Sequence, residues 1–314
     1  MKQKIILLLI SITFFACTEN NNSNNDNTLE TNVVFIENFD GNNPKKLENF
    51  SYGTGRITPH DNLLKIEDGI LKAAIDGNDK AGAWQGRNYA ANELSLFGRY
   101  SARIKIPPVE TQPNVGGVVG FYTYYSDLYG NEQEKDINQN GITDNPEIDF
   151  EWLIANPKII YLTAWTDYEE KPNGTEFRKI SRIINLATGK IYSTTYAEKW
   201  GKITKLTDVE NQPETIKPIP NFDASKNFYT YGFDWKTDNI RWWIINPENS
   251  ADTITLWDYK GNTERITQKP AYLSFNIWHT NDWAAEEKPK STEIPIGAFF
   301  VEFDWIKYER FDRK

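Results

Sequence analysis

The sequence has little of what several common kinds of protein chemistry need. It has one cysteine, Cys17, so the folded part holds no disulfide, no cysteine-ligated metal site and no thiol nucleophile. Its two histidines, His60 and His279, form no His-x-x-His pair, which argues against a catalytic zinc site. The net charge of −9 argues against a nucleic-acid partner, because binding to phosphates depends on basic side chains. It also weighs against heavily sulfated polysaccharides, although a local basic cleft is compatible with it.

The N-terminal residues have the pattern of an export signal. Lys2 and Lys4 precede an apolar run at 5–15, which is too short for a comfortable membrane span. A small residue and Cys17 follow, and this order resembles a bacterial lipoprotein signal whose cleavage leaves a lipidated cysteine. Plain secretion with an incidental cysteine is the alternative. We therefore expect a signal peptide over 1–17 and an extracytoplasmic protein, periplasmic or at the cell surface, anchored to a bacterial membrane.

The segment 18–32 is polar and rich in asparagine, with almost nothing to bury, and predicts a disordered tether. The remainder, 33–314, is expected to form one domain and to act as a monomer. Hydrophobic residues make up 39% of the chain and aromatic residues 14%, which is enough to build a sizeable core.

The dominant period in this domain is two. In the segment 99–106, Tyr100, Ala102 and Ile104 alternate with polar residues. Further segments rich in aromatic and β-branched residues, bounded by turn formers, lie at 117–125, 159–165, 228–235, 240–245, 272–278 and 299–308. No long segment has a helical period. The sequence predicts an all-β fold, a two-sheet antiparallel β-sandwich of the jelly-roll, concanavalin-like kind.

Two polar inserts interrupt this pattern, at 126–146 and at about 167–220. We expect both to be loops, with an added strand or hairpin around 176–195.

Three acids, Glu147, Asp149 and Glu151, alternate with large apolar residues in the segment 147–152. On a strand, the acids would line one face and the apolar residues would pack into the core. The two glutamates could then approach the separation of about 5–5.5 Å that retaining glycoside hydrolysis needs. A third acid between them makes full ionisation costly, which should raise at least one pKa. A solvated polar strand face is the alternative, and the acids alone do not decide between them.

Several ordered segments resemble glycoside hydrolase family 16, the β-jelly-roll endo-glycanases and transglycosylases. The active-site strand of the family is similar to E-I-D-F-E-W at 147–152. Other similar segments, in the order of the family, lie at 97–106, 116–124, 222–235, 240–244, 273–278 and 301–308. The resemblance covers about 33–311 without the two inserts.

The resemblance implies a role for each acid. Glu147 would be the nucleophile, Glu151 the general acid/base and Asp149 the assistant that orients the nucleophile. The strand lacks the extra residue of laminarinases and several algal galactanases, which favours a β-1,4-linked or a mixed-linkage glucan. Of these we expect an endo-hydrolase of mixed-linkage β-1,3/1,4-glucan. However, the lichenase branch continues with Phe-Leu-Gly after its second glutamate, whereas Trp-Leu-Ile follows Glu151 here. The alternatives are a β-1,3-glucan or algal galactan as substrate, a transglycosylase, and a non-catalytic glycan-binding lipoprotein.

Residues that could bind the polysaccharide come from strands expected to border the cleft, where aromatic faces can stack on sugar rings. Core packing is the alternative for each aromatic residue. The candidates are Tyr122, Tyr124, Trp165, Asn276, Trp278 and Trp283. In place of an upstream substrate contact of the family, the candidate substitutes are Trp84, Arg87 and Glu93.

No cofactor is required for this chemistry, but structural calcium is compatible with two sets of residues. The spacing of a calcium loop is present at Asp136, Asn138, Asn140 and Asp144, for which an Asn-Gly turn is the alternative. The resemblance also implies a separate calcium site, in the stretches that contain Glu37 and Asp304.

Overall fold

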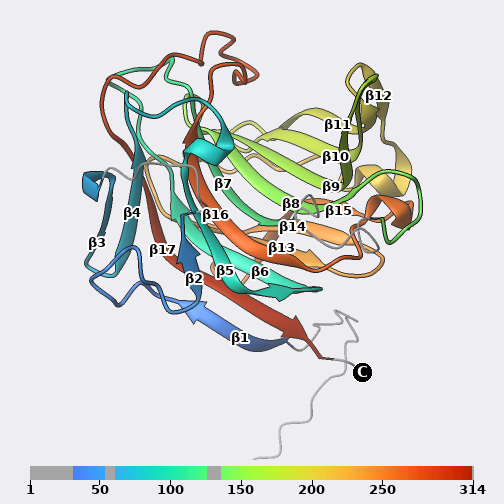
Figure 1. Cartoon of the computed structure of the whole chain (residues 1–314), viewed down its shortest axis with the longest axis horizontal. Coiled ribbons are helices and arrows are strands. Elements are labelled where there is room, and N and C mark those ends of the chain that lie inside the picture. The colour runs from blue at the N-terminus through green and yellow to red at the C-terminus, as the bar shows by residue number, and fades with distance from the viewer. Residues whose placement is uncertain (1–30, 54–60, 126–135, 313–314) are drawn as a thin grey trace, which may run out of the picture.

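The computed structural model describes residues 31–53, 61–125 and 136–312, which form two antiparallel sheets (Figure 1). The first sheet has the order β15 (Thr253–Tyr259), β14 (Ile240–Ile245), β13 (Tyr229–Trp235), β6 (Gly98–Lys105), β17 (Phe299–Phe311), β4 (Ile70–Ile75) and β3 (Leu64–Glu67), and β1 (Thr31–Glu37) also pairs with β17. The second sheet has the order β12 (Lys202–Lys205), β11 (Lys190–Lys199), β10 (Gly174–Asn185), β9 (Ile159–Lys171), β8 (Asp144–Leu153), β7 (Gly117–Tyr124), β16 (Ala271–His279), β5 (Arg87–Ser95) and β2 (Phe50–Tyr52). The predicted all-β sandwich is confirmed.

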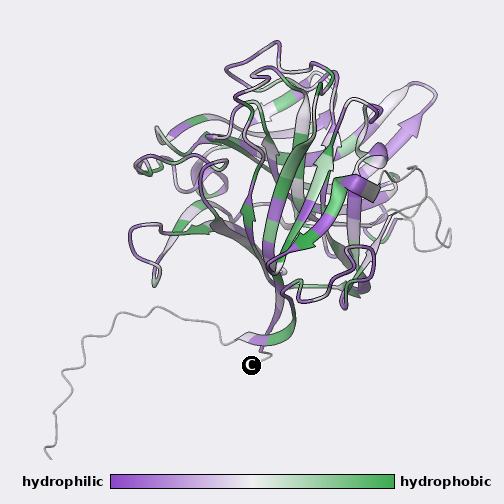
Figure 2. Ribbon diagram, turned by 90° about the vertical axis from the view of Figure 1, so that its left-hand side faces the viewer, coloured by the Kyte–Doolittle hydropathy of each residue, from purple (hydrophilic) through white to green (hydrophobic). Residues whose placement is uncertain are grey.

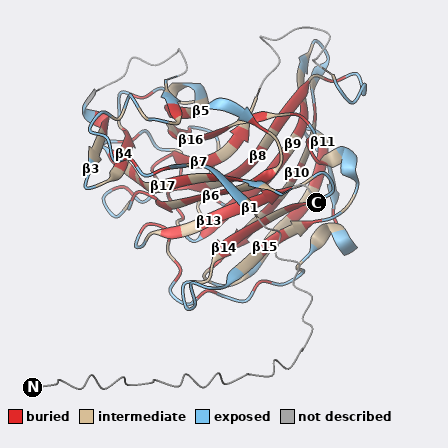
Figure 3. Cartoon of the chain, turned by 90° about the horizontal axis from the view of Figure 1, so that it is seen from below, coloured by how far each residue is buried: buried red, intermediate tan, exposed pale blue. Residues whose placement is uncertain are grey.

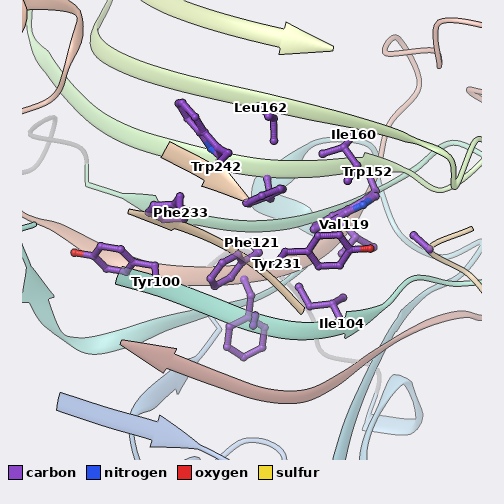
Figure 4. Close-up of a cluster of buried hydrophobic side chains, with 14 of the residues drawn as sticks. Tyr100, Ile104, Val119, Phe121, Trp152, Ile160, Leu162, Tyr231, Phe233 and Trp242 are labelled. Atoms are coloured by element: carbon purple, nitrogen blue, oxygen red, sulfur yellow. The ribbon is translucent and has the colours of Figure 1, made fainter. Parts of the chain in front are cut away.

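The core lies between the two sheets and follows the alternation of the sequence. Buried and more exposed residues succeed one another along the strands (Figure 3), as do hydrophobic and hydrophilic ones (Figure 2). Tyr100 of β6 stacks on Phe233 of β13, with ring centroids 4.9 Å apart, and both side chains are fully buried. Phe121 and Trp152 of the second sheet face them across the core (Figure 4).

The folded part begins slightly earlier than the sequence predicts. Thr31 and Asn32 already pair with Phe311 and Arg310 as the start of β1, so they do not belong to the tether. The rest of the predicted tether and the signal segment with Cys17 lie outside the described residues. Within the described ranges, no helix has the length and apolar character needed to cross a membrane.

The second insert is mainly sheet, not loop. The strands β10, β11 and β12 extend the second sheet beyond β9, and the predicted hairpin is part of this larger extension. Its charged residues concealed the strand pattern. Arg182 in β10 is fully buried, and its guanidinium donates hydrogen bonds of 2.8–3.0 Å to Thr194, Asn211 and the backbone carbonyls of Pro213 and Leu256. A cation with this many acceptors can occupy an inward position.

One hydrogen bond ties the first sheet to the middle of β8. The indole N–H of Trp242 in β14 donates to the backbone carbonyl of Asp149 over 3.0 Å, and the indole stacks on Trp257 with ring centroids 4.9 Å apart (Figure 4). This contact holds β8 from behind, opposite the face that carries the acids.

We expect Trp242→Phe to lower the free energy of unfolding by about 1–2 kcal/mol, because the aromatic ring remains while a buried hydrogen bond is lost. Urea unfolding followed by fluorescence would measure the change. Trp200→Phe is the matched control, since Trp200 is 66% exposed and should give a much smaller change. Equal losses in the two variants would contradict the importance of this bond.

Candidate active site

The three acids lie in one row along β8. Their side chains are on the face of the second sheet that is turned away from the core, here called the acid face. The apolar residues between them, Ile148 and Phe150, are fully buried in the core. The alternation predicted from the sequence is therefore confirmed, and the acids are not scattered around a loop.

The neighbouring strands place polar and aromatic residues beside each acid, because directly opposite residues of antiparallel strands share a face. On β7, the residues opposite the three acids are Tyr124, Tyr122 and Gly120. On β9, the corresponding residues are Trp165, Thr163 and Tyr161. Gly120, opposite Glu151, lets the side chain of Asn276 lie close to the backbone, since an added Cβ would be only 2.6 Å from Oδ1 of Asn276.

Burial controls the charge state of the acids. Loss of solvation, opposed by a hydrogen bond from Asn145 Nδ2 over 2.9 Å, raises the pKa of Glu147 to about 7. Loss of solvation, reinforced by the charge of Glu147, raises the pKa of Glu151 to about 8. Asp149 is 2% exposed, and burial together with the two neighbouring carboxylates raises its pKa well above the ordinary value. Near neutral pH, these directions favour a protonated Glu151 at one end of the row, and Glu147 at the other end loses its proton more readily.

The lysine Lys179 is a member of the site that the sequence did not reveal. It lies on β10 opposite Trp165, and its Nζ is 4.4 Å from the centre of that indole. Its charge lowers the pKa of all three acids, while its own pKa is lowered by burial. Because 167–220 was expected to be mostly loop, no face could be assigned to this residue. The signal that could have found it is the order Lys179, Ile180, Ser181, in which two polar residues flank an apolar one, as on a strand with one face in the core.

Among the predicted substrate residues, Tyr122, Tyr124, Trp165 and Asn276 lie on the acid face. Asn276 Nδ2 donates to Asn88 Oδ1 over 2.9 Å and to the Tyr122 hydroxyl over 3.1 Å. Its Oδ1 is buried and accepts no hydrogen bond from the described residues, so this acceptor is unsatisfied. Trp84, which is 48% exposed, packs edge-on against Tyr124 with ring centroids 5.6 Å apart.

Trp278 and Trp283 belong to a small apolar cluster beside the Glu151 end of the row. Trp283 packs edge-on against Tyr161 at 5.1 Å and lies 6.4 Å from Trp278. Leu153, the next residue of the row on β8, is buried in the same cluster. The two indoles are half-buried, so they form a boundary of the acid face at this end.

Two of the residues predicted to contact the substrate, Arg87 and Glu93, do not lie beside the three acids. Arg87 is fully buried opposite the core residue Ile277 and forms an ion pair with Asp79, so its side chain faces the interior. The prediction for Arg87 is therefore wrong. Glu93 is exposed on β5, which is separated from β8 by β16 and β7. His279 is likewise buried, with Nδ1 2.7 Å from the carbonyl of Gly116.

The loop that precedes β8 is closed by its own hydrogen bonds. Both carboxylate oxygens of Asp136 accept backbone N–H groups, from Asn140 over 3.0 Å and from Gly141 over 2.8 Å. Asp144 accepts from the N–H of Ile137 over 2.8 Å, while the side-chain amides of Asn138 and Asn140 donate to Asp167. The oxygen donors suit calcium chemically, but they already have acceptor roles here.

Glu37 and Asp304 also have protein partners. Glu37 accepts the backbone N–H of Asn49 over 3.0 Å, and Asp304 forms an ion pair with Arg103. Across 31–53, 61–125 and 136–312, no group of three or more His, Cys, Asp or Glu side chains is placed to hold a metal ion. Calcium at either position stays a prediction.

The raised pKa values predict that the acids destabilise the fold as pH rises. An unfolded glutamate releases its proton near pH 4.5, whereas the folded Glu147 and Glu151 keep theirs to about 7 and 8. The folded state therefore binds more protons between these values, and stability falls as pH rises through this range. Relative to the parent, the double variant Glu147→Gln, Glu151→Gln should gain about 1–3 kcal/mol between pH 5 and pH 8. Urea unfolding at both pH values tests this, and a constant difference would contradict it.

Comparison with known proteins gives a family match for part of the chain. Residues 184–306 match the family described as Glycosyl hydrolases family 16. A beta-glucanase of Paenibacillus macerans is 29% identical over 151 residues, which are 47% of this chain and 52% of that protein. A xylanase/beta-glucanase of Ruminococcus flavefaciens is 24% identical over 257 residues, or 78% of this chain and 22% of that protein. The chain thus spans about half, or less, of the length of these relatives.

Solved structures agree on the fold. The endo-beta-1,3-glucanase of Pyrococcus furiosus superposes with a TM-score of 0.53 at 15% identity, covering 92% of this chain and 97% of that one. The catalytic domain of an endo-1,3-beta-glucanase (laminarinase) of Thermotoga petrophila gives 0.52 at 12% identity, covering 91% and 100%. The solved structures thus share the two-sheet sandwich of this chain, and within it residues 184–306 match the family described as Glycosyl hydrolases family 16.

Proposed function

We propose that this chain is a retaining endo-glycoside hydrolase that cleaves a β-glucan, with mixed-linkage β-1,3/1,4-glucan as the favoured substrate. The observation that carries the proposal is the row of Glu147, Asp149 and Glu151 on one strand face, where burial raises the pKa of each acid. The names of the relatives, several of which are beta-glucanases, support the choice of substrate. No cofactor takes part in the proposed chemistry.

Each acid has a distinct task in this mechanism. The ionised Glu147 attacks the anomeric carbon, while Glu151 gives its proton to the departing glycosidic oxygen. Glu151 then takes a proton from water, which attacks the glycosyl-enzyme and restores the original anomeric configuration. Asp149 keeps its proton and hydrogen-bonds to the Glu147 carboxyl, which favours the ionised nucleophile.

The neighbouring residues would bind the sugar rings. Trp165 and Tyr124 flank Glu147 and offer aromatic faces for stacking. The unsatisfied Oδ1 of Asn276, which lies against Gly120, could accept a sugar hydroxyl beside Glu151.

We expect Glu147→Gln to lower the rate of mixed-linkage glucan hydrolysis by at least about a thousandfold, because the amide cannot form the glycosyl-enzyme. Reducing-end assays would give the rate, and NMR of early products from the parent should show the β-anomer first. Glu176→Gln is the matched control, since Glu176 is exposed on β10 and pairs with Lys171. Normal turnover by Glu147→Gln, or an initial α-anomer, would refute the mechanism.

The remaining alternatives differ in products. A transglycosylase would use the same residues and transfer the sugar to an added acceptor, whereas a glycan-binding lipoprotein would release nothing. Sizing the products from mixed-linkage glucan, laminarin, xyloglucan, agar and carrageenan separates these activities and identifies the glycan. Intact acids argue against a pure binding protein, because binding has no need of the three buried carboxyls.

We also propose that the protein works as a monomer outside the cytoplasm, attached to a bacterial membrane through lipid on Cys17. The support is the order of basic residues, apolar run and cysteine in the first 17 residues. Cys17→Ser should move the protein from the membrane fraction to the soluble exported fraction and abolish labelling by radioactive palmitate. Labelling that persists in this variant would contradict the anchor.

A further inference from the structure

The extension of the second sheet carries the acid face well beyond the acids (Figure 1). The row that contains Glu147 continues through Trp165, Lys179 and Ala197 to Ile203 on β12. The row that contains Asp149 continues through Thr163, Ser181, Thr195 and Lys205. Beyond the acids themselves, these rows contain no Asp or Glu. This part of the face is therefore neutral or positive, although the chain as a whole is acidic.

Lys179 occupies a defined position in this region. Its Nζ lies 4.4 Å from the ring centre of Trp165 and 5.7 Å from that of Trp200. Trp200 is held in place although it is 66% exposed, because it packs edge-on against the fully buried Phe177 at 4.8 Å. Two indoles thus hold an ammonium group on the acid face two strands from Glu147, about 10 Å away between α-carbons.

The charge of this ammonium is incompletely compensated. Among the described residues, no carboxylate oxygen lies within 4.0 Å of its nitrogen, whereas Lys171 on the neighbouring strand pairs with Glu176 at 2.8 Å. Burial lowers the pKa of Lys179, and only the more distant acids of β8 raise it. A partly buried cation without a close counter-ion is costly, so an arriving anion would be stabilised there.

We infer that Lys179, between Trp165 and Trp200, binds an acidic substituent of the glycan, a carboxylate or a sulfate ester, at a sugar next to the cleaved bond. The inference rests on the proposed hydrolysis at the acid face and refines its substrate, from an unsubstituted mixed-linkage glucan to a glucan that carries acidic groups. Retaining hydrolysis builds positive charge on the sugar ring in its transition state. A bare ammonium nearby would oppose that charge, whereas an ammonium neutralised by a substrate anion would not.

The competing explanation is that Lys179 is only a counter-charge for the three acids. In that case its removal would change the behaviour of neutral and acidic glycans equally. The two explanations therefore differ in selectivity, and binding distinguishes them without depending on turnover.

The experiment measures affinity by calorimetry in the Glu147→Gln protein, which should hold an uncleaved glycan. The ligands are a mixed-linkage glucan tetrasaccharide, its derivative oxidised at C6 to carboxylates, and its 6-sulfate. We expect at least one acidic form to bind roughly ten- to a hundredfold tighter than the neutral one, as a charge-assisted hydrogen bond would give. Comparison of the two acidic forms identifies the anion.

Adding Lys179→Met should remove this preference, and Lys179→Arg should keep most of it. Lys190→Met is the matched control, because Lys190 lies 4.1 Å from the ring centre of Tyr192 on the same hairpin and should leave the preference intact. Circular dichroism confirms that each variant is folded. Acidic ligands that bind no tighter than the neutral one, or a Lys179→Met variant that weakens all three equally, would overturn the inference. Neither outcome bears on hydrolysis, whose test is the loss of turnover in Glu147→Gln.

Discussion

The site depends on the two-sided environment of strand β8. One face of the strand is fixed in the core by Ile148, Phe150 and Trp152, all fully buried. Trp242 reaches from the opposite sheet and binds the backbone carbonyl of Asp149. The strand therefore cannot shift by one residue without exchanging core and acids, a change that would expose three large apolar side chains and bury three carboxyls without partners. Packing on one face thus determines the geometry of the other.

The same arrangement sets the chemistry of the acids. Three carboxyls at alternate positions on a partly buried face cannot all ionise at low energetic cost. Desolvation is the largest cause of each raised pKa, and their mutual repulsion adds to it for Asp149 and Glu151. The fold thereby lets the acids keep their protons at a pH at which exposed carboxyls lose them, at some cost in stability. In an ordinary structural ion pair, such as Arg99 with Asp234 at 2.7 Å, each charge has an opposite charge beside it, which the row of three acids does not provide.

The strands β10 to β12 give this chain a longer acid face than β8 and its immediate neighbours provide. They bring Lys179 and Trp200 close to residues that are far away in the sequence. The buried Arg182 secures this extension from the other side, through acceptors on β11, on β15 and in the segment 211–213. A region that looks like a polar insertion is consequently part of the framework of the site.

Much of the architecture was predictable from the sequence. Period-two alternation identified the principal strands of both sheets, because each strand has one face in the core and a one-residue error would invert it. It also placed Glu147, Asp149 and Glu151 on a common face. Local pattern failed where a charged side chain is buried together with its partners. Arg87 faces the core and pairs with Asp79, eight residues away, while Arg182 depends on acceptors from three other parts of the chain.

The sequence by itself determined the class of fold and the row of acids, since both follow from alternation within single strands, whereas alternation alone did not decide what the acids do. Only the tertiary structure decided which residues stand beside that row. Strand pairing between segments many residues apart brings Gly120 and Asn276 beside Glu151 and places Lys179 in the row of Glu147, and the burial that alters the acids arises from that assembly. Register between distant strands and loss of solvent are properties of the packed sandwich, so no local pattern in the chain encodes them.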